Sequence, residues 1–205
     1  MDGYVQRAAV DEVFSTIRAG AGTAAVSNSS PMVVRLNATA TLNQFESLLR
    51  IYVLFDTSII SASGTISSAV FSGYGIQKEA GNGSPDLHLA SSSPASNTDL
   101  VAADYQQVGI TSFGSITYAN FTGLQYNDIT LNAAGVTNIS KTGISKFSLQ
   151  TSWDINNSFT GAWVSLANTD FRIGTAELTG TSEDPKLVVT YTVPANSKQD
   201  VIWFD

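Results

Sequence analysis

Apolar and polar residues alternate strictly near the C-terminal end of the chain. In residues 187–193, Leu, Val, Tyr and Val occupy every second position. A period of two is typical of a strand with one buried face. We therefore predict a strand over 186–193 whose core-facing residues are Leu187, Val189 and Tyr191. A simple edge hairpin is the alternative.

Further strand-like segments recur along the chain. They lie at 32–37, 48–56, 64–75, 86–90, 113–121, 126–132, 145–153 and 170–175. The segment 48–56 is apolar on both faces, which is typical of a central strand. Clusters of Gly, Pro, Asn and Ser separate the segments, and we expect one helical turn within 132–141, capped by Asn132.

Many short strands with turn signals between them predict an all-β fold, an antiparallel β-sandwich with at most one or two short helical turns. No linker divides the chain. We expect a single domain over residues 1–193, followed by a C-terminal tail over 194–205. The tail carries Val201, Ile202, Trp203 and Phe204. Because a free apolar tail promotes aggregation, we expect it to dock, either on its own domain or on a neighbour.

Composition narrows the classes of partner. Charged residues make up 13% of the chain, against about 25% in ordinary globular proteins, so Ser, Thr, Asn and Gly must fill the outward positions. The net charge is -7 and no Lys/Arg cluster exists, which argues against a nucleic-acid partner. No apolar run approaches the ~18 residues of a membrane span, so we expect no membrane insertion, and residues 1–13 lack the pattern of a signal peptide.

Three segments resemble the DNRLRE-type modules, which are related to disaggregatase-type repeats. Residues 50–75 resemble the family's "R-x-x-x-F-D-T-S…A-x-I-x-S-A-x-L" core, residues 126–154 its "LNA-x-G-L-x-x-I-x-K-T-G" stretch, and residues 179–192 its terminal "GT-x-x-D-P-K-L-x-V-x-Y" strand. The segments follow the family's order, although the letters DNRLRE are absent and the tail continues beyond the usual last strand.

The resemblance implies a jelly-roll sandwich similar to carbohydrate-binding modules. It also implies a non-catalytic role, because members of the family are parts of cell-surface proteins, polysaccharide-acting enzymes and phage or viral particles. Some relatives bind acidic polysaccharides. The acidic composition of this chain, which has no basic patch, argues against such a ligand here.

The residues offer little catalytic chemistry. His88 is the only histidine, and it alternates with Leu87 and Leu89, so we expect it on the solvent side of its strand. No G-x-S-x-G elbow is present. With one His and no Cys, a zinc site lacks ligands. Glu183 and Asp184 precede a proline and indicate a turn better than a glycosidase pair. We predict no catalytic residue.

Two kinds of binding site are predicted. Asp154 and Asn156 present oxygen atoms in a loop that suits a structural calcium ion, although Asx turns have the same composition without an ion. Exposed aromatic rings on a sandwich can stack against sugars. The main candidates are Trp163, Tyr105, Tyr118 and Tyr126, with Tyr74 as a further one and core packing as the alternative for each. Trp153 is expected in the core, on the side of Phe147 and Leu149.

Together these features indicate a non-catalytic structural or binding protein on a particle or cell surface. A phage virion is the favoured setting, in a decoration, fibre or adhesion role. Its partners would be copies of itself or other particle-surface proteins. The alternative is a polysaccharide-binding module of a secreted or cell-surface protein, and a glycosidase is the third candidate.

Overall fold

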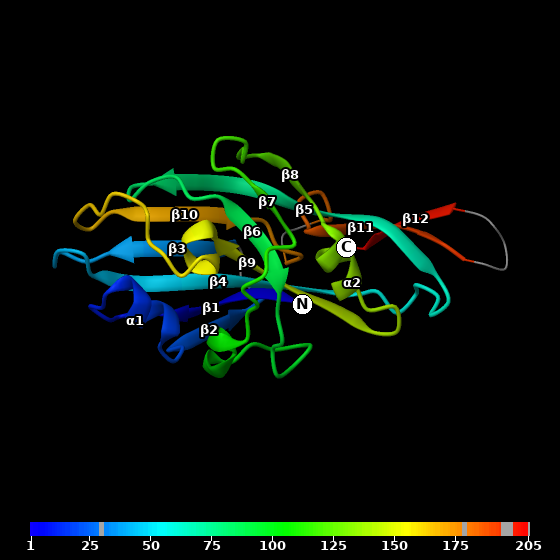
Figure 1. Ribbon diagram of the computed structural model, residues 1–205, viewed down its shortest axis with the longest axis horizontal. Coiled ribbons are helices and arrows are strands. Elements are labelled where there is room, and N and C mark those ends of the chain that lie inside the picture. Colours follow the sequence, from blue (N-terminus) through cyan, green and yellow to red (C-terminus); the bar gives the residue numbers. More distant parts are fainter. Residues whose placement is uncertain (29–30, 178–179, 194–198, 205) are drawn as a thin grey trace.

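Long antiparallel strands dominate the computed structural model of the chain (Figure 1), which describes residues 1–28, 31–177, 180–193 and, for their backbone, 199–204. The strands are β1 (Asp2–Arg7), β2 (Ala24–Ser27), β3 (Met32–Ala38), β4 (Phe45–Asp56), β5 (Thr65–Ala80), β6 (Leu87–Ser91), β7 (Gly114–Ile116), β8 (Gln125–Thr130), β9 (Ile144–Thr151), β10 (Asn168–Ile173), β11 (Lys186–Thr192) and β12 (Gln199–Phe204). The helical segments are α1 (Phe14–Ala19), the 3-10 turn η1 (Ala102–Gln106), α2 (Ala133–Asn138) and α3 (Ser152–Ile155). The predicted all-β antiparallel class is confirmed, with more short helices than expected.

One continuous sheet forms both layers of the sandwich. The strand order is β12-β11-β5-β10-β3-β4-β9-β6-β7, while β1 joins β4 and β8 joins β5. β4 pairs with β3 through residues 45–49 and with β9 through residues 51–56. The sheet therefore divides along β4 and curls into a barrel-like sandwich, so that β6 lies over the β3–β4 layer in Figure 1.

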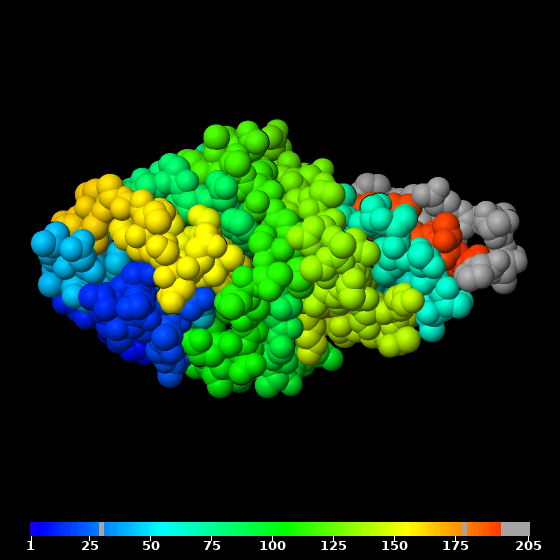
Figure 2. Space-filling view, viewed as in Figure 1, coloured from blue at the N-terminus to red at the C-terminus, as the bar shows by residue number. Residues whose placement is uncertain are grey.

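Both faces of β4 are buried, as the sequence of 48–56 predicted. Ile51, Val53 and Phe55 pack into a first core between the two layers. Tyr52 and Leu54 point the other way, into a second core with residues of α1, η1 and α3. Figure 2 shows that these helical segments and the loops around them form part of the face in view.

The predicted strand 186–193 is confirmed as β11. Leu187, Val189 and Tyr191 are buried in the first core, and the residues between them are half-buried. β11 pairs with β5 on one side and with β12 on the other. The structure contains both the core-facing strand and the edge hairpin: β11 forms a hairpin with β12 at the end of the strand order, and its apolar residues face the first core.

The C-terminal tail docks on its own domain. β12 runs antiparallel to β11 in continuous register, from Leu187 opposite Phe204 to Thr192 opposite Gln199. Of the two arrangements left open by the sequence, the structure has the one within the chain. The side chains of the predicted assembly residues Val201, Ile202, Trp203 and Phe204 lie outside the described part.

Local capping explains where two elements begin. Asn132 Oδ1 accepts a hydrogen bond of 3.0 Å from the backbone N–H of Gly135, which caps α2 as predicted. Thr151 accepts one of 3.3 Å from Asp154 N–H and starts α3. β9 consequently ends at Thr151 rather than at the expected residue 153. The side chains of Trp153 and Asp154 therefore take their directions from α3 instead of from a strand.

Candidate binding surface

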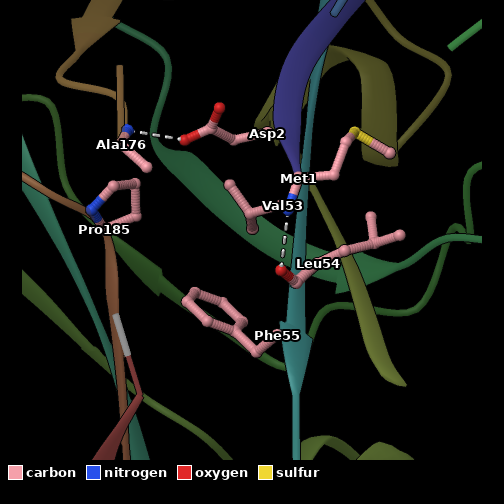
Figure 3. Close-up of a pocket in the computed structure, with 7 residues that line it drawn as sticks. All are labelled: Met1, Asp2, Val53, Leu54, Phe55, Ala176 and Pro185. Carbon is pink, nitrogen blue, oxygen red and sulfur yellow. Dashed lines mark hydrogen bonds between the residues drawn. The ribbon is translucent and has the colours of Figure 1, made fainter. Parts of the chain in front are cut away.

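A small open pocket of about 40 Å³ lies where β1 meets the segment after β10 (Figure 3). Its lining is apolar apart from Asp2, whose Oδ2 accepts a 3.0 Å hydrogen bond from the N–H of Ala176. Burial raises the pKa of Asp2 to about 7, the bond from Ala176 opposes the rise, and hydrogen bonding and repulsion from Glu177 add to it. This pocket was not predicted, because β1 itself was not predicted from the sequence.

The tyrosine patch, formed by Tyr74, Tyr126, Lys186 and Asp128, lies on the outer face of β8, β5 and β11. Tyr74 and Tyr126 are directly opposite in register, and their rings meet edge to face at 5.4 Å. The ammonium of Lys186 lies 4.5 Å from the centre of the Tyr126 ring. Asp128 accepts a hydrogen bond from Ser72 beside them. The patch thus combines two half-buried rings with charged groups of both signs.

Tyr118 and Trp163 are half-buried but stand apart from this patch. The Tyr118 ring contacts Phe171 of the first core. The ammonium of Lys78 lies 4.4 Å from the centre of the Tyr118 ring. Trp163 packs against the second core and donates a 3.1 Å hydrogen bond to the carbonyl of Gln44. The structure therefore does not assemble the four predicted aromatic residues into one platform.

The predicted exposure of Tyr105 is wrong. Its side chain is fully buried in the second core, where its hydroxyl donates a 2.9 Å hydrogen bond to the carbonyl of Ile17. The 3-10 turn η1 directs the ring inward, where the guanidinium of Arg50 lies 4.1 Å from its centre. Trp153 is buried as predicted, but α3 directs it into the second core, against Phe159 rather than Phe147.

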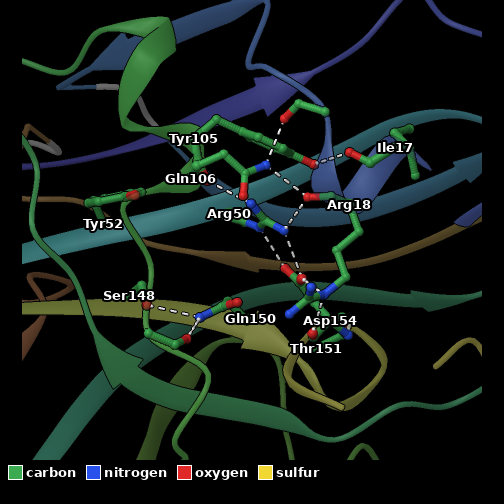
Figure 4. Close-up of polar contacts among 12 residues, drawn as sticks. Ile17, Arg18, Arg50, Tyr52, Tyr105, Gln106, Ser148, Gln150, Thr151 and Asp154 are labelled. Atoms are coloured by element: carbon green, nitrogen blue, oxygen red, sulfur yellow. Dashed lines mark hydrogen bonds and ion pairs between the residues drawn. The ribbon is translucent and has the colours of Figure 1, made fainter. Parts of the chain in front are cut away.

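The Asp154 carboxylate is held by arginine (Figure 4). Arg50 donates to both of its oxygen atoms, from Nε at 2.7 Å and from Nη2 at 2.8 Å, and Arg18 Nε lies 3.1 Å away. Asp154 and Arg50 are each 1% exposed. A calcium ion at Asp154 would meet two positive charges, so the calcium prediction is corrected to a buried ion pair. The other predicted ligand, Asn156, is exposed at the end of α3.

The rest of the Arg50 guanidinium bonds to backbone. Nη1 donates a 2.6 Å hydrogen bond to the carbonyl of Tyr105, and Nη2 donates one of 3.1 Å to the carbonyl of Arg18. Burial raises the pKa of the nearby Tyr52 and Tyr105 hydroxyls, which therefore remain protonated. This cluster joins β4 to α1, η1 and α3, and its closed, fully occupied geometry suits a structural role.

His88 is half-buried, between the buried Leu87 and Leu89. Its Nδ1 lies 2.8 Å from the hydroxyl of Ser112, and that hydroxyl donates to the carbonyl of Gly114. Burial lowers the pKa of His88, against the attraction of Asp86.

Two further features are absent from the described residues. They contain no group of three or more His, Cys, Asp or Glu side chains that could hold a metal ion. Nor does this part of the chain contain a helix with the length and apolar composition that a membrane crossing requires.

We expect Asp154→Ala to lower the free energy of unfolding by about 3–5 kcal/mol, because it leaves the Arg50 guanidinium buried without its carboxylate. Glu12→Ala is the matched control, since it removes the more exposed Arg7–Glu12 pair and should cost no more than about 1 kcal/mol. Urea denaturation of both variants measures the difference. Equal losses of unfolding free energy in the two variants would show that the buried pair stabilises the fold no more than the exposed pair does.

The raised pKa of Asp2 predicts a loss of stability as pH rises. Between the ordinary value of 3.8 and about 7, the folded state keeps a proton that the unfolded state has released, so the free energy of unfolding falls across this window and then levels off. Asp2→Asn should remove this loss, up to about 4 kcal/mol by pH 8, and Glu177→Gln should reduce it in part. Unfolding of both variants and the unaltered chain from pH 4 to 8 measures it, and parallel curves would contradict the assignment.

Comparison of the chain with protein-family models and with curated proteins finds no match. The resemblance to DNRLRE-type modules therefore stays a prediction that rests on its three motifs.

Proposed function

We propose that the protein is a non-catalytic binding protein of a particle or cell surface, and that it contacts a polysaccharide through the tyrosine patch. A phage virion is the setting that we favour. The sequence resemblance supports the same ligand class, as the family is similar to carbohydrate-binding modules.

The observation that carries the proposal is the placement of Tyr74 and Tyr126 on the outer face of a rigid sheet. Sugars present apolar C–H faces and hydroxyl groups together, so a site for them combines aromatic rings with hydrogen-bonding groups. Lys186 and Asp128 supply a donor and an acceptor beside the two rings. β5 holds the patch between β8 and β11, so little ordering is needed on binding.

The charged groups support a non-catalytic role. The carboxylate of Asp154 is neutralised by arginine. A glycosidase would need two carboxyl groups facing one open cleft. Asp2 lines a pocket that is small for a sugar chain, since ligand pockets usually exceed about 300 Å³.

We expect Tyr126→Ala to weaken polysaccharide binding about tenfold, a change of about 1.4 kcal/mol, because it removes the ring that packs against the apolar face of a sugar. Tyr118→Ala is the matched control, because Tyr118 is another half-buried tyrosine with a lysine ammonium over its ring. It lies on a different part of the surface, so its removal should leave binding unchanged. Binding to immobilised cellohexaose, mannohexaose, chitohexaose and hexagalacturonate is the measurement. Failure of the chain to bind any of the four would refute the proposal.

Self-association is a second candidate, favoured by the position of β12. It ends the strand order, and no other described strand pairs with its outer edge. Residues 199–204 contain neither Lys nor Pro, the residues that commonly protect such an edge. Two copies could therefore pair their β12 strands antiparallel about a two-fold axis, which extends the sheet across a dimer.

Single cysteines test this pairing, because the chain has none. We expect one or two neighbouring positions among Asp200→Cys, Val201→Cys, Ile202→Cys and Trp203→Cys to give a disulfide-linked dimer on oxidation, since only residues beside the axis approach their counterparts. Ala40→Cys, on an exposed bend, should remain monomeric. Light scattering of the unaltered chain that shows a monomer at every concentration, together with no cross-linked dimer, would exclude β12 pairing.

A further inference from the structure

Four polar residues form a compact group on β3 and β10, here called the polar block. Arg35 lies directly opposite Asp170 in register, and Asn37 lies directly opposite Asn168. They alternate with residues such as Phe171 that point into the first core. Because successive side chains of a strand point to opposite faces, the polar block lies on the outer face of this layer.

One oxygen of Asp170 accepts every hydrogen bond that this carboxylate makes within the described residues. Its Oδ2 accepts from Arg35 Nη2 at 3.0 Å, from Asn168 Nδ2 at 2.9 Å and from Arg172 Nε at 3.1 Å. Its Oδ1 has no partner there, although the residue is fully buried. A buried carboxylate normally uses both oxygen atoms.

Three further atoms of the polar block share this condition. Arg35 Nε, Asn37 Oδ1 and Asn168 Oδ1 are buried and have no partner among the described residues. Leaving a buried donor or acceptor unpaired is costly. The four atoms belong to two neighbouring residue pairs on one face of the sheet. Their grouping points to a group from outside the chain that completes their hydrogen bonds.

Flexible side chains contact Asp170 and Asn168: Arg35 and Arg172 donate to Asp170, and Glu79 accepts from Asn168. The side chains of Arg35 and Arg172 are 27% and 29% exposed, and that of Glu79 is 39% exposed. Arginine and glutamate side chains can turn aside without a change in the backbone. A ligand that arrives from solvent can therefore reach Asp170 and the two asparagines.

The charges of this region define the class of ligand. Arg35 and Arg172 balance Asp170 and Glu79, so neither a cation nor an anion is favoured. The unpaired atoms include both a donor and acceptors, and a hydroxyl group satisfies either kind. A chain of neutral sugars offers many hydroxyl groups in a row.

We propose that the polar block binds hydroxyl groups of a neutral polysaccharide, as a second contact region for the chain that the tyrosine patch holds. This inference rests on the proposed function. Tyr74 and Glu79 both belong to β5, so the two regions are separated by roughly 17 Å at ~3.3 Å per residue. The ligand is therefore an extended oligosaccharide rather than a single sugar.

Asn37→Leu tests the unpaired oxygen without any ligand. Replacing an unsatisfied buried acceptor by an apolar group of similar size should raise the thermal midpoint, by about 2–4 °C. Asn127→Leu is the matched control, because the Asn127 side chain makes three hydrogen bonds of 2.7–2.9 Å and its loss should lower the midpoint. If Asn37→Leu also lowers it, the polar block is a structural network and the inference is wrong.

Binding of cello- and manno-oligosaccharides of two to six units tests the ligand class. We expect Asn37→Leu to weaken hexasaccharide binding about tenfold and to leave disaccharide binding unchanged, whereas Tyr126→Ala weakens both. If hexasaccharides depend on Tyr126 alone, the proposed function stands and this inference fails. If only hexagalacturonate binds, the neutral class is wrong, and if none of these probes binds, the proposed function and the ligand assignment fall together, whatever the stability result.

Discussion

The buried guanidinium of Arg50 is the constraint on which the second core depends. It lies in the middle of β4, the strand along which the sheet divides, and a charge at that depth must be fully paired. Asp154 supplies the opposite charge, while the backbone carbonyls of Tyr105 and Arg18 accept the remaining protons. Three helical segments that share no sequence pattern are thereby fixed on one face of a strand.

This arrangement limits which surface remains for a partner. The first core lies between the layers, and the helical segments cover the second core. The outer face of β8, β5, β10 and β3 keeps regular strands and carries both the tyrosine patch and the polar block. A face of paired strands with rings at one end and paired charges at the other suits a long ligand better than a small molecule.

The local alternation of apolar and polar residues made several strands predictable. Elements and side chains whose placement depends on distant partners were not predicted. β11 was predicted from its alternating apolar and polar residues, and β4 from its apolar residues on both faces. β1 and β2 carry weaker patterns and gain their stability from pairing with each other and with β4. Tyr105 and Asp154 lie in polar, loop-like sequence, and only a long-range partner, Arg50, makes their burial favourable. The polar block could not be predicted from the sequence either, because 135 positions separate Arg35 from Asp170.

The pairing of β3 with β10 also affects how the chain is made. β3 is synthesised early, yet the strand that covers its open edge follows more than a hundred residues later. At ~5–20 residues per second, a ribosome leaves that edge exposed for on the order of ten seconds. Pairings between distant strands are also slow to form once the chain is complete. During its synthesis the chain of this protein therefore exposes an unpaired strand edge to neighbouring chains on the polysome.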